Sequence, residues 1–106
     1  MKWVKVFDSP QIADLQFSDT NTLKIVIGKK EICLAKYNEQ YFAVSNLCPH
    51  QFESLSKGKI THYGEIVCPF HFYRFNLRTG AECQNRTNEL KTFQVKVDQT
   101  GLFIYC

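Results

Sequence analysis

Residues 48–72 read CPHQFESLSKGKITHYGEIVCPFHF, and this stretch decides how the sequence is interpreted. It begins with one Cys-Pro pair and ends shortly after a second, and a histidine follows each pair almost at once. A proline fixes its own φ and steers the preceding residue away from helical conformation. Each cysteine is therefore expected at the entrance of a stiff loop. The candidate metal ligands are Cys48, His50, Cys68 and His71.

Three interpretations of these four side chains are open. They could be neighbours by chance, since free cysteine is commonly a core residue. Two thiolates and two imidazoles also suit tetrahedral Zn²⁺, although zinc sites usually group cysteine with cysteine and histidine with histidine. A [2Fe–2S] centre with two cysteines on one iron and two histidines on the other needs one ligand of each kind from each loop. The order Cys-x-His, seventeen intervening residues, Cys-x-x-His has that form.

The rest of the chain predicts strands joined by turns. Short runs rich in β-branched and aromatic residues recur, and Gly-, Asn- and Asp-containing turns separate them. Only Pro10–Phe17 has a helical pattern. The sequence therefore predicts an all-β antiparallel sandwich or open barrel, with strands at Trp3–Phe7, Leu23–Ile27, Glu31–Tyr37, Tyr41–Val44, Glu65–Val67, Phe93–Val97 and Leu102–Tyr105.

From about residue 20 onward the chain resembles the Rieske-type [2Fe–2S] ferredoxin family. The resemblance is carried by the ligand loops and by the residues around them: Glu31-Ile32-x-Leu34, Tyr41-x-Ala43-Val44-Ser45-Asn46-x-Cys48-Pro49-His50, Leu55-Ser56-x-Gly58, Gly64-x-Ile66-x-Cys68-Pro69-x-His71, Phe75-x-Leu77-x-Thr79-Gly80, Phe93-x-Val95-x-Val97 and Gly101-Leu102-Phe103-Ile104. It implies a single Rieske domain over residues 1–106, in which a β-sandwich carries a small cluster-binding subdomain at about 46–80. One [2Fe–2S] cluster per chain would be held by Cys48, His50, Cys68 and His71.

The resemblance implies a soluble one-electron carrier between a reductase and a terminal oxygenase, and not an enzyme in its own right. Two other functions stay open. One is a small subunit of an NAD(P)H-dependent nitrite reductase-like complex, and the other is a zinc-stabilised interaction module. Metal content and the spectrum of the reduced protein distinguish these classes.

The chain also departs from the family pattern. Many relatives cover the cluster with a proline-containing segment, whereas residues 81–90 read AECQNRTNEL. High-potential members carry a disulfide between the two loops, and the matching positions here are Glu53 and Phe70. They also supply serine and tyrosine hydroxyls where this chain has Tyr73 and Phe75. Fewer hydrogen bonds to the cluster predict a potential at the low end of the Rieske range.

Composition limits the partners and the compartment. Five cysteines are an odd number, which argues against a closed disulfide framework and favours a reducing, cytoplasmic location. A net charge of +3 without a dense basic stripe gives no indication of nucleic-acid binding, and no apolar run is long enough to span a membrane. Cys33 is expected in the core, while Cys83 and Cys106 receive no role.

Overall fold

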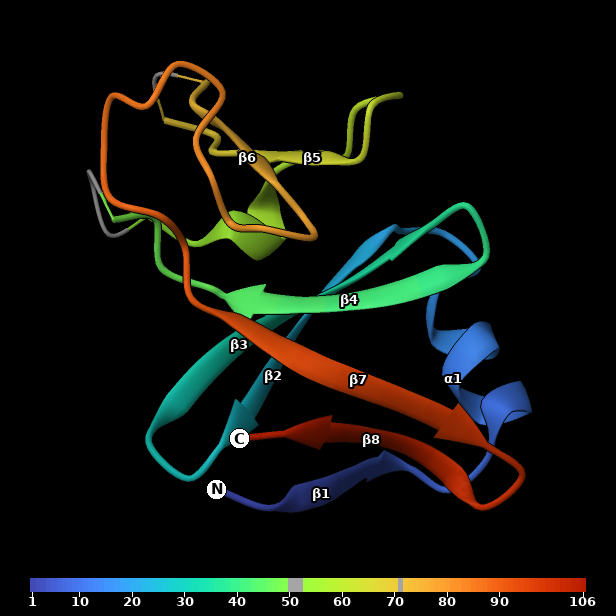
Figure 1. Ribbon diagram of the computed structural model, residues 1–106. Coiled ribbons are helices and arrows are strands. Elements are labelled where there is room, and N and C mark those ends of the chain that lie inside the picture. Colours follow the sequence, from blue (N-terminus) through green and yellow to red (C-terminus); the bar gives the residue numbers. More distant parts are fainter. Residues whose placement is uncertain (50–52, 71) are drawn as a thin grey trace.

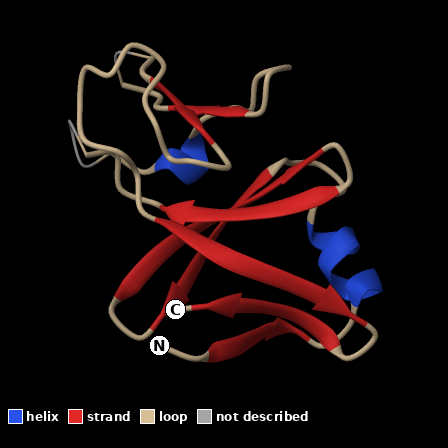
Figure 2. Ribbon diagram, in the orientation of Figure 1, coloured by secondary structure: helices blue, strands red, loops and turns tan. Residues whose placement is uncertain are grey.

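A computed structural model describes residues 1–49, 53–70 and 72–106 of the chain. Strands make up most of its regular structure (Figures 1 and 2). The elements, in chain order, are β1 (Trp3–Phe7), α1 (Pro10–Gln16), β2 (Thr22–Ile27), β3 (Lys30–Tyr37), β4 (Gln40–Ser45), the 3-10 helix η1 (Leu55–Lys57), β5 (Glu65–Val67), β6 (Arg74–Asn76), β7 (Thr92–Asp98) and β8 (Gly101–Tyr105).

The strands form one large antiparallel sheet and one small hairpin. The large sheet has the order β1-β8-β7-β4-β3-β2, and β5 pairs only with β6. Figure 1 shows the large sheet strongly curled, with the hairpin and η1 set beyond β4. The predicted all-β antiparallel fold with a small additional subdomain is thus confirmed, and the subdomain lies at one end of the molecule.

Strands β3 and β4 carry the two hydrophobic cores of the fold. Alternate residues of a strand point to opposite faces of a sheet. On β3, Ile32 and Leu34 pack into a core shared with β8 and α1, whereas Cys33 and Ala35 pack into a core shared with η1, β5 and β6. All four are fully buried, which confirms the core position expected for Cys33. The same two strands therefore support both the base of the sheet and the subdomain above it.

The helix lies against the base of the sheet. Ser9 caps it by accepting a hydrogen bond from the backbone N–H of Ile12 at 3.1 Å, and Pro10 occupies the first turn, where no N–H is needed. Ala13 and Phe17 are buried in the base core. The helical pattern predicted for Pro10–Phe17 is confirmed within one residue. Strand β6 was not predicted, because its three residues are too few to show a periodic pattern.

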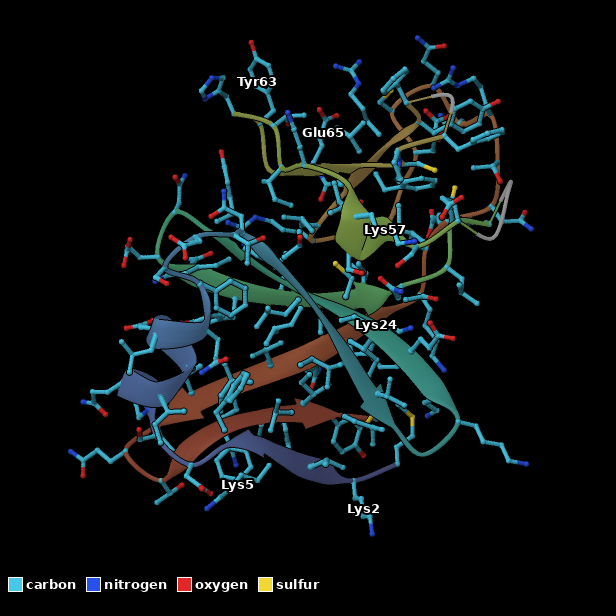
Figure 3. The ribbon with its side chains drawn as sticks, turned by 180° about the vertical axis from the view of Figure 1, so that it is seen from behind. Lys2, Lys5, Lys24, Lys57, Tyr63 and Glu65 are labelled. Atoms are coloured by element: carbon cyan, nitrogen blue, oxygen red, sulfur yellow. The ribbon has the colours of Figure 1, made fainter. Side chains whose placement is uncertain are left out.

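The chain termini and the β5–β6 hairpin lie at opposite ends of the molecule. The chain termini meet at the base, where the backbone groups of Lys2 and Cys106 exchange two hydrogen bonds of 3.0 Å. Figure 3 shows Lys2 and Lys5 at this end and Tyr63 and Glu65 at the opposite end, beside the β5–β6 hairpin. Among the described residues, no helix combines the length and the apolar character needed to cross a bilayer.

Candidate metal centre

The first candidate loop begins where β4 ends. Leu47 forms a β-bridge with Ser54, and the backbone N–H of Cys48 donates to the carbonyl of Glu53 at 2.9 Å. These contacts close the loop from both sides, so the position of Cys48 is set by backbone bonds. His50 lies in this loop, outside the described residues.

Asn46 anchors the first loop from within the core. It is fully buried, and its side-chain amide donates to the Ser54 hydroxyl at 2.8 Å. Its amide oxygen accepts from the backbone N–H of Ser56 at 2.9 Å, while its own N–H donates to the carbonyl of Glu31 at 2.9 Å. Sequence reasoning gave this residue no role beyond the family pattern. Its position just before Cys-Pro was the available signal, since asparagine often bonds to nearby backbone in loops.

The second candidate loop is the turn of the β5–β6 hairpin. Cys68 follows β5 directly, and its backbone N–H donates to the carbonyl of Tyr73 at 2.8 Å. Phe72 has a φ of +58°, so the chain reverses through a left-handed residue before β6 begins. His71 lies in this turn, outside the described residues.

The two loops are held together by a close backbone approach. A Cβ atom at Gly58 would lie 1.8 Å from the carbonyl oxygen of Val67, so only glycine allows the end of η1 to lie against β5. The neighbouring backbone N–H of Val67 donates to the carbonyl of Lys59 at 2.9 Å. The first loop is therefore fixed relative to the second at the residue that precedes Cys68.

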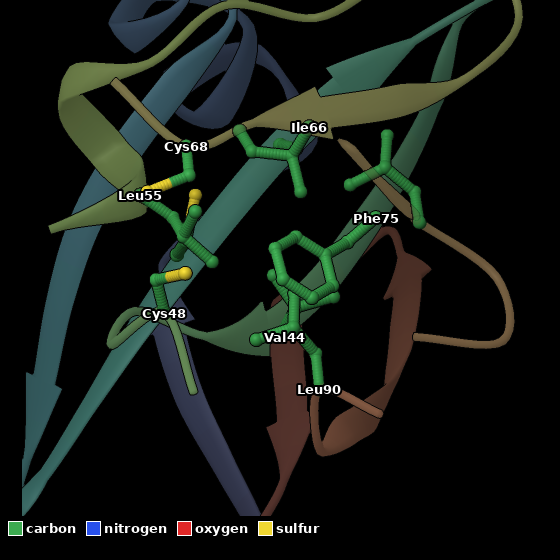
Figure 4. Close-up of a cluster of buried hydrophobic side chains, with 10 residues drawn as sticks. Val44, Cys48, Leu55, Ile66, Cys68, Phe75 and Leu90 are labelled. Atoms are coloured by element: carbon green, nitrogen blue, oxygen red, sulfur yellow. The ribbon is translucent and has the colours of Figure 1, made fainter. Parts of the chain in front are cut away.

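This arrangement brings Cys48 and Cys68 into the same buried cluster of side chains. Both cysteines are fully buried, and Figure 4 shows them in one cluster with Leu55, Ile66 and Phe75. The pKa of Cys68 is raised to about 11, chiefly by burial; the backbone N–H of Phe70 acts to lower it, and a hydrogen bond with the Cys48 thiol raises it again. Two neighbouring thiols in an apolar site can both ionise when a metal cation compensates their charge. The donor set therefore suits a thiolate-bound metal.

Two phenylalanine side chains of the second loop face solvent. Phe70 is 47% exposed and Phe72 is 72% exposed. The sequence places three phenylalanines next to the candidate ligands, Phe52, Phe70 and Phe72, and leaves open whether they belong to the core or form an apolar rim. Phe70 and Phe72 lie at the surface, and Phe52 lies outside the described residues. An apolar surface therefore borders the candidate centre.

A third segment, residues 81–90, lies beside the second loop. Its residue Glu82 forms a β-bridge with Phe75 of β6, and the N–H of Cys83 donates to the carbonyl of Arg74 at 2.9 Å. The sequence indicated only that the segment lacks the proline of many relatives. It gave no signal for Glu82 as a buried residue, because a lone glutamate is ordinarily exposed.

Comparison with known proteins identifies the family. The sequence pattern of the Rieske [2Fe–2S] domain matches residues 2–96. The chain belongs to the Rieske [2Fe–2S] domain family.

Relatives of this Rieske domain include ferredoxin components. One is the 3-phenylpropionate/cinnamic acid dioxygenase ferredoxin subunit of Photorhabdus laumondii, 37% identical over 75 residues, which cover 70% of this chain and 71% of the relative. Another is the ferredoxin component of the naphthalene 1,2-dioxygenase system of Pseudomonas putida, 30% identical over 98% of this chain and 95% of the relative. A solved complex of reduced oxygenase and oxidized ferredoxin in carbazole 1,9a-dioxygenase matches with a TM-score of 0.80 at 25% identity, over 97% of this chain and 92% of the matched chain.

The family confirms two predictions made from the sequence. The Rieske domain carries a [2Fe–2S] cluster, and it serves as an electron carrier. Family membership also favours this cluster over the zinc alternative. Of the four candidate ligands, the structure brings Cys48 and Cys68 together, and the two histidines lie outside the described residues.

Proposed function

We propose that this chain is the ferredoxin component of an oxygenase system, which takes one electron from a reductase and passes it to a terminal oxygenase. The observation that carries the proposal is the burial of Cys48 and Cys68 in one core cluster, in a chain whose sequence matches a ferredoxin component over nearly its whole length. The same comparisons favour this function over the nitrite reductase-like subunit, since the relatives described above are named as parts of dioxygenase systems.

The proposed ligands are those indicated by the sequence. Cys48 and Cys68 would hold the inner iron, and His50 and His71 would hold the outer iron. A bound [2Fe–2S] cluster supplies one-electron redox chemistry at moderate potential. The chain contributes the rest: it keeps both thiols out of water, fixes their spacing through the Gly58 contact, and orients the first loop through Asn46.

The proposal extends to domain organisation and location. Residues 1–106 would act as one domain with the cluster-binding part at about 46–80, and the burial of Leu90 in the same core supports extending that part to residue 90. We also infer a cytoplasmic location, supported by the free thiols of Cys33, Cys83 and Cys106, which a reducing compartment maintains.

The ligand assignment is tested by metal analysis and electron paramagnetic resonance of anaerobically purified protein. Wild-type protein should hold two irons and two sulfides per chain and give the reduced spectrum of a nitrogen-ligated cluster. Substituting alanine for Cys48, His50, Cys68 or His71 should abolish that signal. His62→Ala and Cys106→Ser are the matched controls and should retain it. Iron-free wild-type protein that binds zinc stoichiometrically would refute the proposal.

The function itself is tested by reconstitution. Product formation should require the chain together with an NAD(P)H-dependent reductase and a Rieske oxygenase from the same organism. Isolation of the native chain in a stable complex with a sirohaem-containing protein would instead support the nitrite reductase-like subunit.

A further inference from the structure

Segment 81–90 is organised by a buried carboxylate, that of Glu82. The guanidinium of Arg86 donates to it twice, from Nε to Oε1 at 3.1 Å and from Nη2 to Oε2 at 2.8 Å. The backbone N–H groups of Arg86 and Gln84 donate to it at 2.7 and 3.3 Å, and the Cys83 thiol donates at 3.2 Å. Because a buried carboxylate is costly unless its oxygens are well supplied with donors, these bonds define one compact conformation of the segment.

The ion pair reaches the second cluster-binding loop through an aromatic ring. The guanidinium carbon of Arg86 lies 3.8 Å from the centroid of the Tyr73 ring. The carbonyl of Tyr73 in turn accepts the backbone N–H of Cys68, a proposed ligand, at 2.8 Å. A continuous series of contacts thus runs from Glu82 through Arg86 and Tyr73 to the backbone of Cys68.

The backbone of this segment excludes proline at one position. Asn85 has a φ of +54°, which proline cannot adopt. The backbone of the segment is further tied to the hairpin, since Asn76 donates to the carbonyl of Ala81 at 2.9 Å and Leu90 donates to that of Gly80 at 2.8 Å. The chain therefore holds a charge-paired turn beside the second loop.

We propose that the Glu82–Arg86 pair and the Tyr73 ring form a clasp that positions the second cluster-binding loop. Arg86 and Tyr73 are positioning residues, which act through the backbone of Cys68. This inference rests on the proposed ligand set. Outer-shell contacts of this kind matter because they orient the ligands, and their removal typically costs about 10–100-fold in metal affinity.

The clasp is tested by the rate at which anaerobic protein loses its cluster to an iron chelator, followed by visible absorbance. Arg86→Gln and Tyr73→Leu should each lose the cluster about tenfold faster than wild type. Because the two side chains act as one unit, the double variant should lose it no faster than the faster single variant. Arg86→Lys keeps the charge but not the two-point pairing or the planar stack, so its rate should fall between those of wild type and Arg86→Gln.

The matched control is Arg78→Gln. Arg78 also lies over an aromatic ring, that of Phe42 at 5.0 Å, and bonds to Gln40 at 3.1 Å, but it takes no part in the series of contacts that leads to Cys68. It should lose the cluster at the wild-type rate. A second measurement, amide hydrogen exchange of the cluster-free protein, should show faster exchange at residues 68–73 in Arg86→Gln and no change in Arg78→Gln.

Two results would overturn the clasp: equal rates of cluster loss in Arg86→Gln and Arg78→Gln, or multiplicative effects in the double variant. Either result leaves the proposed function intact, because wild-type protein would still hold its cluster. Failure of the wild type itself to take up iron and sulfide would overturn both. A thermal melt of each cluster-free variant separates loss of the fold from loss of the clasp.

Discussion

At the scale of single residues, the centre depends on polar groups that are buried and hydrogen-bonded. Asn46 and Glu82 are among the few polar side chains buried in the described part of the chain, and each holds a loop that borders the candidate cluster site. Both bond mainly to backbone N–H groups or to residues of their own loop. Such groups define a single loop conformation, because any other conformation would leave buried polar atoms without hydrogen bonds.

Ionisation of Glu82 makes part of the free energy of unfolding depend on pH in the acid range. The hydrogen bond from Arg86 lowers the pKa of Glu82 from 4.5 to about 2 in the folded state. Because the pKa of Glu82 is lower in the folded than in the unfolded protein, its ionisation stabilises the fold at any pH above the pKa of the unfolded state. This contribution is lost as pH falls from about 4.5 toward about 2. We expect the urea concentration at the midpoint of unfolding to fall less steeply over that pH range in Glu82→Gln than in wild type. Glu89→Gln, on the exposed part of the same segment, should follow the wild-type curve.

At the scale of elements, the contact between η1 and β5 determines how the two loops meet. Gly58 has an ordinary φ of −88°, so its requirement is steric and not conformational. Gly28 is the contrasting case, with a φ of +61° and open space around the position that a Cβ atom would take. The two glycines therefore separate the effect of a close approach from that of a left-handed turn.

We expect Gly58→Ala to lower the free energy of unfolding by about 3 kcal/mol or more and to prevent stable cluster binding, because the added methyl group would overlap the Val67 carbonyl. Gly28→Ala should cost only about 1–2 kcal/mol, the penalty for a left-handed alanine, and should keep the cluster. Urea denaturation and iron content measure the two effects. Full cluster binding by Gly58→Ala would show that the loops can meet without this contact.

Much of the fold and part of the centre could be predicted from the sequence. Alternation located β3, β4, β7 and β8, and the paired Cys-Pro motifs located Cys48 and Cys68 at loop entrances. The clasp could not be predicted, since Tyr73 and Arg86 are distant in sequence and meet only through tertiary packing. The short strand β6 was missed because its three residues form a strand through their pairing with β5 and not through their own pattern.

At the scale of the whole molecule, the surroundings of the cluster set its potential. Phe75 is fully buried and offers no hydroxyl, and the positions of the loop disulfide are occupied by Glu53 and Phe70. We expect a redox titration to give a midpoint near the lower limit of the Rieske range of roughly −150 to +300 mV. A midpoint in the upper half would mean that other donors stabilise the reduced state.

A basic groove lies beside the first loop and should favour an acidic partner. It is lined by Lys29, Lys30 and Lys91, with the Phe93 ring between the last two at 5.9 and 5.4 Å from their amines. Leu47, the residue before Cys48, also lines it. Glu31, an acidic side chain in the groove, is paired with Lys24 at 3.1 Å. Positive charge near a redox centre steers weak electron-transfer encounters.

We expect reversal of Lys29, Lys30 and Lys91 to glutamate to slow oxidation of the reduced protein by ferricyanide about tenfold at low salt, with the difference shrinking as salt is added. The matched control reverses Lys2, Lys5 and Lys96, which changes the net charge equally at the base of the molecule. Stopped-flow absorbance measures both. Equal slowing in the two variants would assign the effect to overall charge and not to the groove.

The division of β3 between two cores has a consequence for how this chain can vary in length. Side chains at 32 and 34 fill one interior and those at 33 and 35 fill the other, so an inserted residue within the strand would exchange the two sets. Both interiors would then receive side chains of the wrong volume at once. Length changes should therefore be accommodated at the hairpin tips around Gly28 and Asn38, where the backbone already turns through positive φ in solvent. Natural variants of this protein should accordingly differ in loop size there while keeping β3 and β4 at constant length.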